Sequence, residues 1–169
     1  MYKAANTPRP PRADARRNQL QILRCAAEVF VERGPNGPLE EIARCAGVGI
    51  GTLYRHFPDR QSLMDAVALD AITRIDEAAT HCVAEFSDPF AGLVAYLHAA
   101  LGLGVSAVIP VLLDRVDLDT PEIAKLRDHG VAMVQRLIDA AQAEGSLRPD
   151  VSFADIGVIL VRLSRPLPG

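Results

Sequence analysis

The stretch from Ala91 to Leu113 constrains the fold most, because it contains no Asp, Glu, Lys or Arg. A stretch of this length either spans a bilayer or lies buried inside a helical protein. Small residues interrupt its middle and both flanks are acidic, whereas a membrane segment carries basic residues on its cytoplasmic side. We therefore expect two buried helices here rather than one membrane span. The residues that decide this are Gly102, Gly104, Ser106, Asp88 and Asp114.

The composition excludes most other fold classes. Hydrophobic residues make up 49% of the 169 residues, which is enough for a packed core. Only 5% of the residues are aromatic, none is Trp, and runs rich in β-branched and aromatic residues are nearly absent. Such runs are typical of strands. The sequence therefore predicts an all-α fold.

Helix-capping signals divide the chain into segments. Asp, Ser and Thr residues precede several apolar periodic segments, and Gly or Pro residues follow them. Gly130 lies inside the segment 120–144, where it could mark a break. The expected helices cover residues 15–33 after an Asp14 cap, 39–46, 50–56, 60 to at least 79 after an Asp59 cap, a helix opened by Asp88 and Pro89, 120–144 and 152–163.

Charge is distributed unevenly along the chain. Residues 1–62 carry a net charge of +4 and residues 63–169 carry −7, which gives −3 overall. A basic N-terminal part on an acidic body indicates that only one end binds a polyanion. Residues 1–14 hold three prolines and several basic residues without apolar periodicity, so we expect a disordered basic arm there.

The three cysteines do not indicate a disulfide framework, because their number is odd and they are widely spaced, at Cys25, Cys45 and Cys82. We expect reduced thiols, with Cys25 and Cys45 at outward-leaning helix positions. A redox switch in this part of the chain is the less favoured alternative. Residues 1–8 lack the apolar segment of a secretory signal. These observations favour the reducing cytoplasm.

Residues 39–57 carry the clearest functional signal. They read as two short helices joined by a tight turn at Gly47, with small and apolar side chains facing inward. This pattern is typical of a helix-turn-helix, whose second helix can lie in the major groove of DNA. The inward residues are Ile42, Ala43, Ala46, Val48, Leu53 and Phe57. The outward residues are Gly49, Ile50, Gly51, Thr52, Arg55 and His56, with Tyr54 flanking them.

The pattern E-I-A-x-x-A-G-V-x-x-G-T-L-Y-x-H-F, followed by Asp59, Arg60, Ser62 and Leu63, resembles the TetR family of bacterial transcriptional regulators. The resemblance is specific over residues 15–67 and only architectural beyond them. It implies a helix-turn-helix DNA-binding domain over residues 15–75 and a helical ligand-binding and dimerisation domain over residues 76–169. A long helix is expected to join the two.

Family resemblance assigns contacts to individual positions. Ile50, Gly51 and Thr52 fall where groove contacts are made, and Tyr54 and His56 match positions whose rings touch phosphates. Basic residues at two helix starts add backbone contacts, because helix N-termini favour phosphate and cationic side chains neutralise it. These residues are Arg16, Arg17 and Arg60.

The sequence departs from the family pattern at two places. Pro38 and Leu39, followed by Glu40 and Glu41, replace the usual Thr or Ser at the start of the second helix, so no phosphate contact is expected there. Glycines leave the recognition helix few polar groups. Base readout is therefore expected from Thr52, Arg55 and a methyl contact of Ile50 with thymine. A helical ligand-binding protein that has lost DNA recognition is the alternative.

The body is expected to bind a small apolar effector and to form a homodimer, as the resemblance implies. Ligand binding would release a double-stranded DNA operator, and the repressor role follows from the family's usual behaviour. The last two helices build the dimer interface in relatives, whereas this chain offers one clear helix after Gly145. We therefore expect C-terminal structure to be missing. The candidate pocket residues are Phe86, Phe90, Tyr96, His98 and Met133.

No constellation in the sequence predicts an enzyme. The chain lacks a Gly-rich phosphate loop, an H-E-x-x-H motif and a catalytic triad spacing. His81 and Glu85 lie four residues apart and could bind a metal as a pair, but two ligands are too few. We expect no catalytic residues, no metal and no cofactor.

Overall fold

The computed structural model describes residues 11–164 of the chain, and within them it contains eight helices and no strand. This confirms the predicted all-α class. The predicted arm falls mostly on residues 1–10, which lie outside the described residues. The helices are α1 (Pro11–Arg33), α2 (Leu39–Cys45), α3 (Ile50–His56), α4 (Arg60–Glu85), α5 (Pro89–Leu103), α6 (Val105–Leu112), α7 (Pro121–Ala143) and α8 (Phe153–Leu163).

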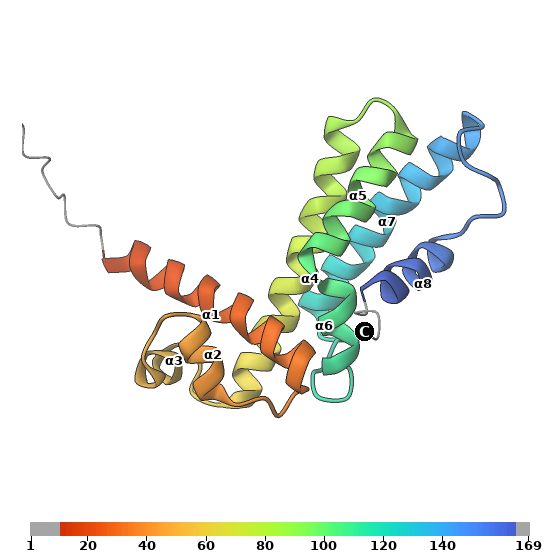
Figure 1. Cartoon of the computed structure of the whole chain (residues 1–169). Coiled ribbons are helices and arrows are strands. Elements are labelled where there is room, and N and C mark those ends of the chain that lie inside the picture. The colour runs from red at the N-terminus through yellow and green to blue at the C-terminus, as the bar shows by residue number, and fades with distance from the viewer. Residues whose placement is uncertain (1–10, 165–169) are drawn as a thin grey trace, which may run out of the picture.

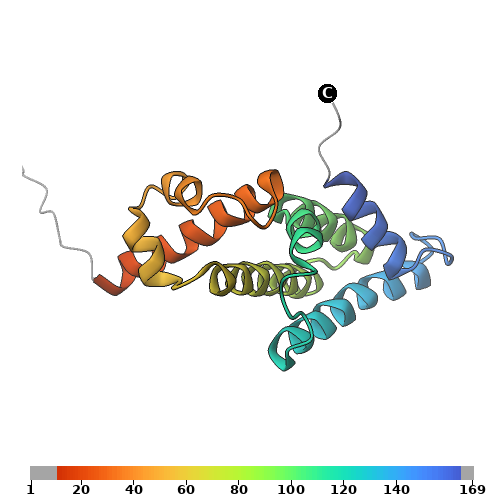
Figure 2. The ribbon, with the colours of Figure 1, turned by 90° about the horizontal axis from the view of Figure 1, so that it is seen from below.

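Helix α4 connects the two parts of the molecule. Figure 1 shows α1, α2 and α3 at one end of α4, while α5 and α7 run along its other half. The view from below places α6 between α1 and α8 (Figure 2). We call α1–α3 with the first turns of α4 the head, and the remaining helices the body.

Two hydrophobic cores lie along α4. The first joins α1, α2 and α3 to residues of α4 such as Leu63 and Val67, and it also takes Val108 and Leu112 from α6. The second packs the far half of α4 against α5, α7 and α8. The boundary expected between residues 75 and 76 falls inside α4, and α6 contributes to the core of the head.

Local hydrogen bonds explain where several helices begin. The Asp59 carboxylate accepts from the Ser62 N–H at 2.7 Å, and the Ser62 hydroxyl accepts from the Asp59 N–H, which completes a capping box. Asp88 and Thr120 cap α5 and α7, and Ser152 caps α8. Hydrogen bonds from Ser152 lower the pKa of Asp155, the third residue of α8. The predicted caps at these four positions are confirmed.

The uncharged stretch forms two helices, as expected. Gly104 adopts a left-handed conformation with φ of 66°, and α5 and α6 meet there at an angle of 54°. No single helix in residues 11–164 is long and apolar enough to cross a membrane, although the bent α5–α6 pair passes the same test of length and composition.

Two expectations about helix boundaries are wrong. Helix α1 begins at Pro11, inside the predicted arm of residues 1–14, because proline is well suited to a first helical turn. Helix α7 continues through Gly130 without a break. A Cβ atom on Gly130 would lie 3.3 Å from Asp76 Oδ1, so this glycine permits the close approach of α7 to α4.

The expectation of reduced thiols in the head is also wrong, and of the two cysteines expected to lean outward only Cys45 is exposed. A disulfide joins Cys25 of α1 to Cys45 of α2, and only 4% of Cys25 is exposed. Cys82 is a free cysteine buried in the second core, and burial raises the pKa of its thiol. The sequence argument failed because the pair is brought together by packing of α1 on α2.

The bend at Gly104 yields a test of backbone conformation. Replacing Gly104 with Ala is expected to lower the free energy of unfolding by about 1–2 kcal/mol, because a left-handed conformation strains residues with a Cβ. Gly102→Ala is the matched control: it lies inside α5 with open space around it and should gain about 0.5–1 kcal/mol. Urea unfolding measures both, and equal effects would contradict the assignment of strain.

Candidate DNA-binding site and body cavity

Helices α2 and α3 form the predicted helix-turn-helix. Ile42, Ala43, Leu53 and Phe57 are buried, and Val48 packs partly against the same core. The turn between the helices reverses at Gly47, where φ is 66°. The Val48 N–H donates to the Ala43 carbonyl at 3.0 Å, which closes the turn. The inward set predicted from sequence is confirmed.

The outward face of α3 and its preceding turn is open to solvent. Ile50 is 38% and Tyr54 47% exposed, so neither side chain is packed into the core of the head. Gly49, Gly51 and Arg55 are exposed, while Thr52 and His56 are half-buried. The Arg55 guanidinium donates to the Thr52 hydroxyl at 3.4 Å, so these two polar groups lie together on the surface. In a helix-turn-helix, the exposed face of the second helix is the one that can lie in the major groove.

Arg60 is tied to the fold of the head. Its Nη1 donates to the carbonyls of Pro35 and Gly37, at 3.2 and 2.6 Å, and so links α4 to the turn between α1 and α2. A Cβ atom on Gly37 would lie 2.7 Å from Val29 Cγ1, so the turn is also packed tightly on α1. The arginine therefore holds the turn, a role that the sequence argument did not foresee.

The remaining charged residues of the head lie on its surface. Arg16 and Arg17 are exposed in α1, and Arg17 forms an ion pair with Asp14 at 2.7 Å. Glu41, expected to make no phosphate contact, lies 3.7 Å from the Arg33 guanidinium. This pairing offsets part of the acidic charge at the start of α2.

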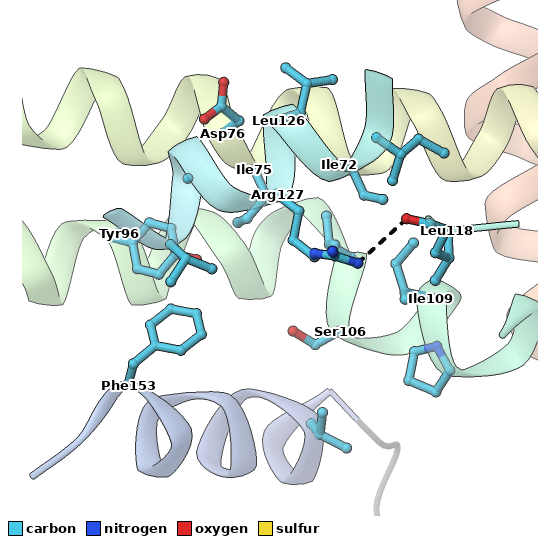
Figure 3. Close-up of a pocket in the computed structure, with 16 residues that line it drawn as sticks. Ile72, Ile75, Asp76, Tyr96, Ser106, Ile109, Leu118, Leu126, Arg127 and Phe153 are labelled. Atoms are coloured by element: carbon cyan, nitrogen blue, oxygen red, sulfur yellow. Dashed lines mark hydrogen bonds between the residues drawn. The ribbon is translucent and has the colours of Figure 1, made fainter. Parts of the chain in front are cut away.

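The body contains a partly open cavity of about 290 Å³ beside α4 (Figure 3). Its walls come from α4, α5, α6, α7 and α8 and are mainly aliphatic. A few polar groups, Asp76, Ser106 and Arg127, lie among them, and Arg127 donates to the Leu118 carbonyl at 3.4 Å. The other lining residues are Ile72, Ile75, Tyr96, Val105, Ile109, Pro110, Leu118, Ile123, Leu126, Gly130, Val131, Phe153 and Val161.

One of the five predicted pocket residues lines this cavity. Tyr96 does so, and burial raises its pKa to about 12, so its hydroxyl is protonated at neutral pH. Phe86 and Phe90 are exposed near the turn between α4 and α5, His98 is exposed on α5, and Met133 packs against the second core. These four residues do not line this cavity.

Most lining residues were missed because no sequence pattern separates them from ordinary core residues. Ile72 and Ile75 belong to the apolar face of α4, and Ile109 and Leu126 to those of α6 and α7. Asp76 is the exception. An acidic residue on the inner face of a long helix was visible in the sequence, and its Oδ1 lies 2.6 Å from His129 Nδ1.

An exposed recognition helix on a small three-helix head, joined by a long helix to a body with an apolar cavity, defines a helix-turn-helix transcriptional regulator. The family model of bacterial regulatory proteins, tetR family, matches residues 22–67. A TetR regulatory protein from Mycobacterium vanbaalenii is 35% identical with a TM-score of 0.70, covering 90% of this chain and 92% of that one. The chain belongs to the TetR family.

Other comparisons agree with this assignment. A TetR transcriptional regulator from Streptomyces coelicolor is 32% identical with a TM-score of 0.65, covering 88% of this chain and 87% of that one. The transcriptional regulator UidR of Escherichia coli is 25% identical over an alignment that covers 89% of this chain and 80% of UidR. These relatives extend the similarity beyond the head into the body.

The contacts of Arg60 generate a test. Arg60→Gln is expected to lower the free energy of unfolding by about 1–3 kcal/mol, because two partly buried hydrogen bonds lose their charged donor. Arg55→Gln, at an exposed position of α3, is the control and should change it by less than about 0.5 kcal/mol. Urea unfolding distinguishes the two, and an unchanged stability of Arg60→Gln would contradict the structural role.

Proposed function

We propose that the protein is a sequence-specific repressor that binds double-stranded operator DNA through the head and is released by a small apolar ligand in the body. The exposed face of α3 carries this proposal. Its large side chains, Ile50 and Tyr54, are exposed to solvent, and the exposed, cationic Arg55 follows Tyr54 in the same helix. Such a face is suited to DNA.

Individual residues of the head have different proposed roles. Thr52 and Arg55 read base edges, and Ile50 contacts a thymine methyl group. Gly49 and Gly51 let the backbone approach the DNA closely, since neither glycine has an atom within 4 Å of the position of an added Cβ. Tyr54 and His56 contact phosphates. Arg16, Arg17 and Arg60 place positive charge against the DNA backbone.

Helix α6 supports a coupling between ligand and DNA. One side of it lines the cavity through Ser106 and Pro110, while Val108 and Leu112 pack into the core of the head. A ligand that fills the cavity pushes on α6, and α6 in turn contacts α1. Movement of α6 would therefore change the orientation of the head. A ligand that binds one orientation better than the other can in this way release DNA.

Helix α8 supports a homodimer. Its outer face exposes Val158 at 58%, Ile159 at 45% and Leu163 at 63%. Apolar side chains of this size that lie next to one another on one helix are typical of a protein interface. Two heads on a symmetric dimer would cover two half-sites of an operator, and we place this action in the cytoplasm.

The main test is the salt dependence of DNA binding. A fluorescently labelled duplex from upstream of the gene is expected to bind tightly, and a scrambled duplex weakly, with affinity falling steeply as salt rises. Arg55→Ala should relax the preference for the upstream duplex over the scrambled one, because Arg55 is proposed to read a base edge. Fluorescence anisotropy measures both.

Arg148→Ala is the matched control, because Arg148 is an exposed arginine of the body that pairs with Asp150. Its affinity for DNA should equal that of the wild type. Absence of binding to any duplex at low salt would contradict the proposal and favour a ligand-binding protein without DNA recognition. Light scattering on the same samples reports whether the binding species is a dimer.

The cavity yields a second test with the dye 1-anilinonaphthalene-8-sulfonate, whose fluorescence rises in apolar sites. Leu126→Trp is expected to weaken dye binding about tenfold, because the indole fills space that Leu126 lines. Leu113→Trp is the control at an exposed position outside the lining, and it should leave dye binding unchanged. Equal dye titrations for both variants would place the ligand elsewhere.

A further inference from the structure

A disulfide in the head has no part in the regulatory function proposed above. It joins Cys25, in the middle of α1, to Cys45, the last residue of α2, across 20 residues of sequence. Their Cα atoms are 5.8 Å apart, a separation typical of disulfides. The two helices bring the sulfurs together through the packing of the head, so the pair is a product of the native fold.

The two cysteines differ in access to solvent. Cys45 is exposed, whereas only 4% of Cys25 is exposed. A small molecule can therefore reach Cys45 first, while Cys25 is reached only by the sulfur of Cys45. The remaining cysteine, Cys82, is buried in the second core and does not compete. This pairing of one exposed and one buried sulfur is suited to thiol–disulfide exchange.

A carboxylate lies beside the exposed sulfur. Glu28 Oε2 is 3.8 Å from Cys45 Sγ, and Glu28 follows Cys25 by one helical turn, so all three groups face one another. The carboxylate can accept a hydrogen bond from the Cys45 thiol when the pair is reduced. Its side chain is exposed, and its other oxygen lies 3.4 Å from the Arg24 guanidinium, which offsets part of the negative charge beside Cys45.

We propose that Cys25 and Cys45 form a reversible oxidation site that exchanges with low-molecular-weight disulfides and thiols. The Cys45 thiolate attacks one sulfur of a small disulfide, forms a mixed disulfide and releases one small thiolate, which takes up the proton that Cys45 lost. Cys25 then attacks Cys45 Sγ, which forms the internal disulfide and releases a second small thiol. The protein loses two hydrogen atoms and the small disulfide gains both.

The closed pair fixes the end of α2 to α1 directly before the turn that leads into α3. Reduction removes this covalent link and leaves the apolar contacts of Ile42 and Ala43 with α1 to hold α2 in place. The oxidised head is therefore the more stable form, because a closed loop restricts the unfolded chain. This consequence holds whether or not the head binds DNA.

The test uses the full chain equilibrated, while folded, with set ratios of reduced and oxidised glutathione. Alkylation of the thiols and intact mass measurement should give three free thiols at the reducing end and one at the oxidising end, with a midpoint between them. Peptide mapping should place the bond between Cys25 and Cys45. The midpoint of thermal unfolding should be roughly 5–10 °C higher for the oxidised form.

Two variants control the experiment. Cys45→Ser, at the exposed position, should abolish the internal bond and the difference in thermal midpoint, whereas Cys82→Ser should behave like the wild type. Three free thiols at every ratio would overturn the proposal. So would a bond between two chains, a bond that includes Cys82, or reduced cysteines that retain zinc and resist oxidation. The peptide map of the wild-type protein tests the proposal even where a variant does not fold.

Discussion

Helix α4 is the constraint on which the rest of the structure depends. It supplies Leu63 and Val67 to the core of the head and Ala79 and Cys82 to the core of the body, in one continuous helix of 26 residues. At about 1.5 Å per residue it is roughly 39 Å long. Because both cores share it, neither part can be rearranged without an effect on the other, and α6 adds a second connection at the same junction.

Features that depend on neighbouring residues could be predicted from the sequence. The caps at Asp59, Asp88, Thr120 and Ser152 were found because a capping side chain bonds to a backbone group only two or three residues away. The turn at Gly47 was found for the same reason. The face of α3 followed from its helical period, so most of the candidate DNA-binding site was also accessible.

Features that depend on contacts between distant segments could not be predicted. Aromatic character suggested Phe86 and Phe90 for the pocket, but a cavity is defined by how five helices meet, and aliphatic residues make up most of its wall. Gly130 resembled a helix breaker because the sequence does not reveal that Asp76 lies against it. The pairing of Cys25 with Cys45 likewise depends on packing, as do the carbonyl partners of Arg60.

The turn between α1 and α2 has a consequence for the geometry of operator recognition. Gly37 packs closely against Val29, and Arg60 donates hydrogen bonds to the carbonyls of the residues on both sides of Asn36. A longer or more mobile turn would lose these contacts. These contacts hold the turn, α1 and α4 of the head together as one unit. In the proposed dimer, the distance between the two half-sites that the heads can match would then depend on how the two bodies are joined.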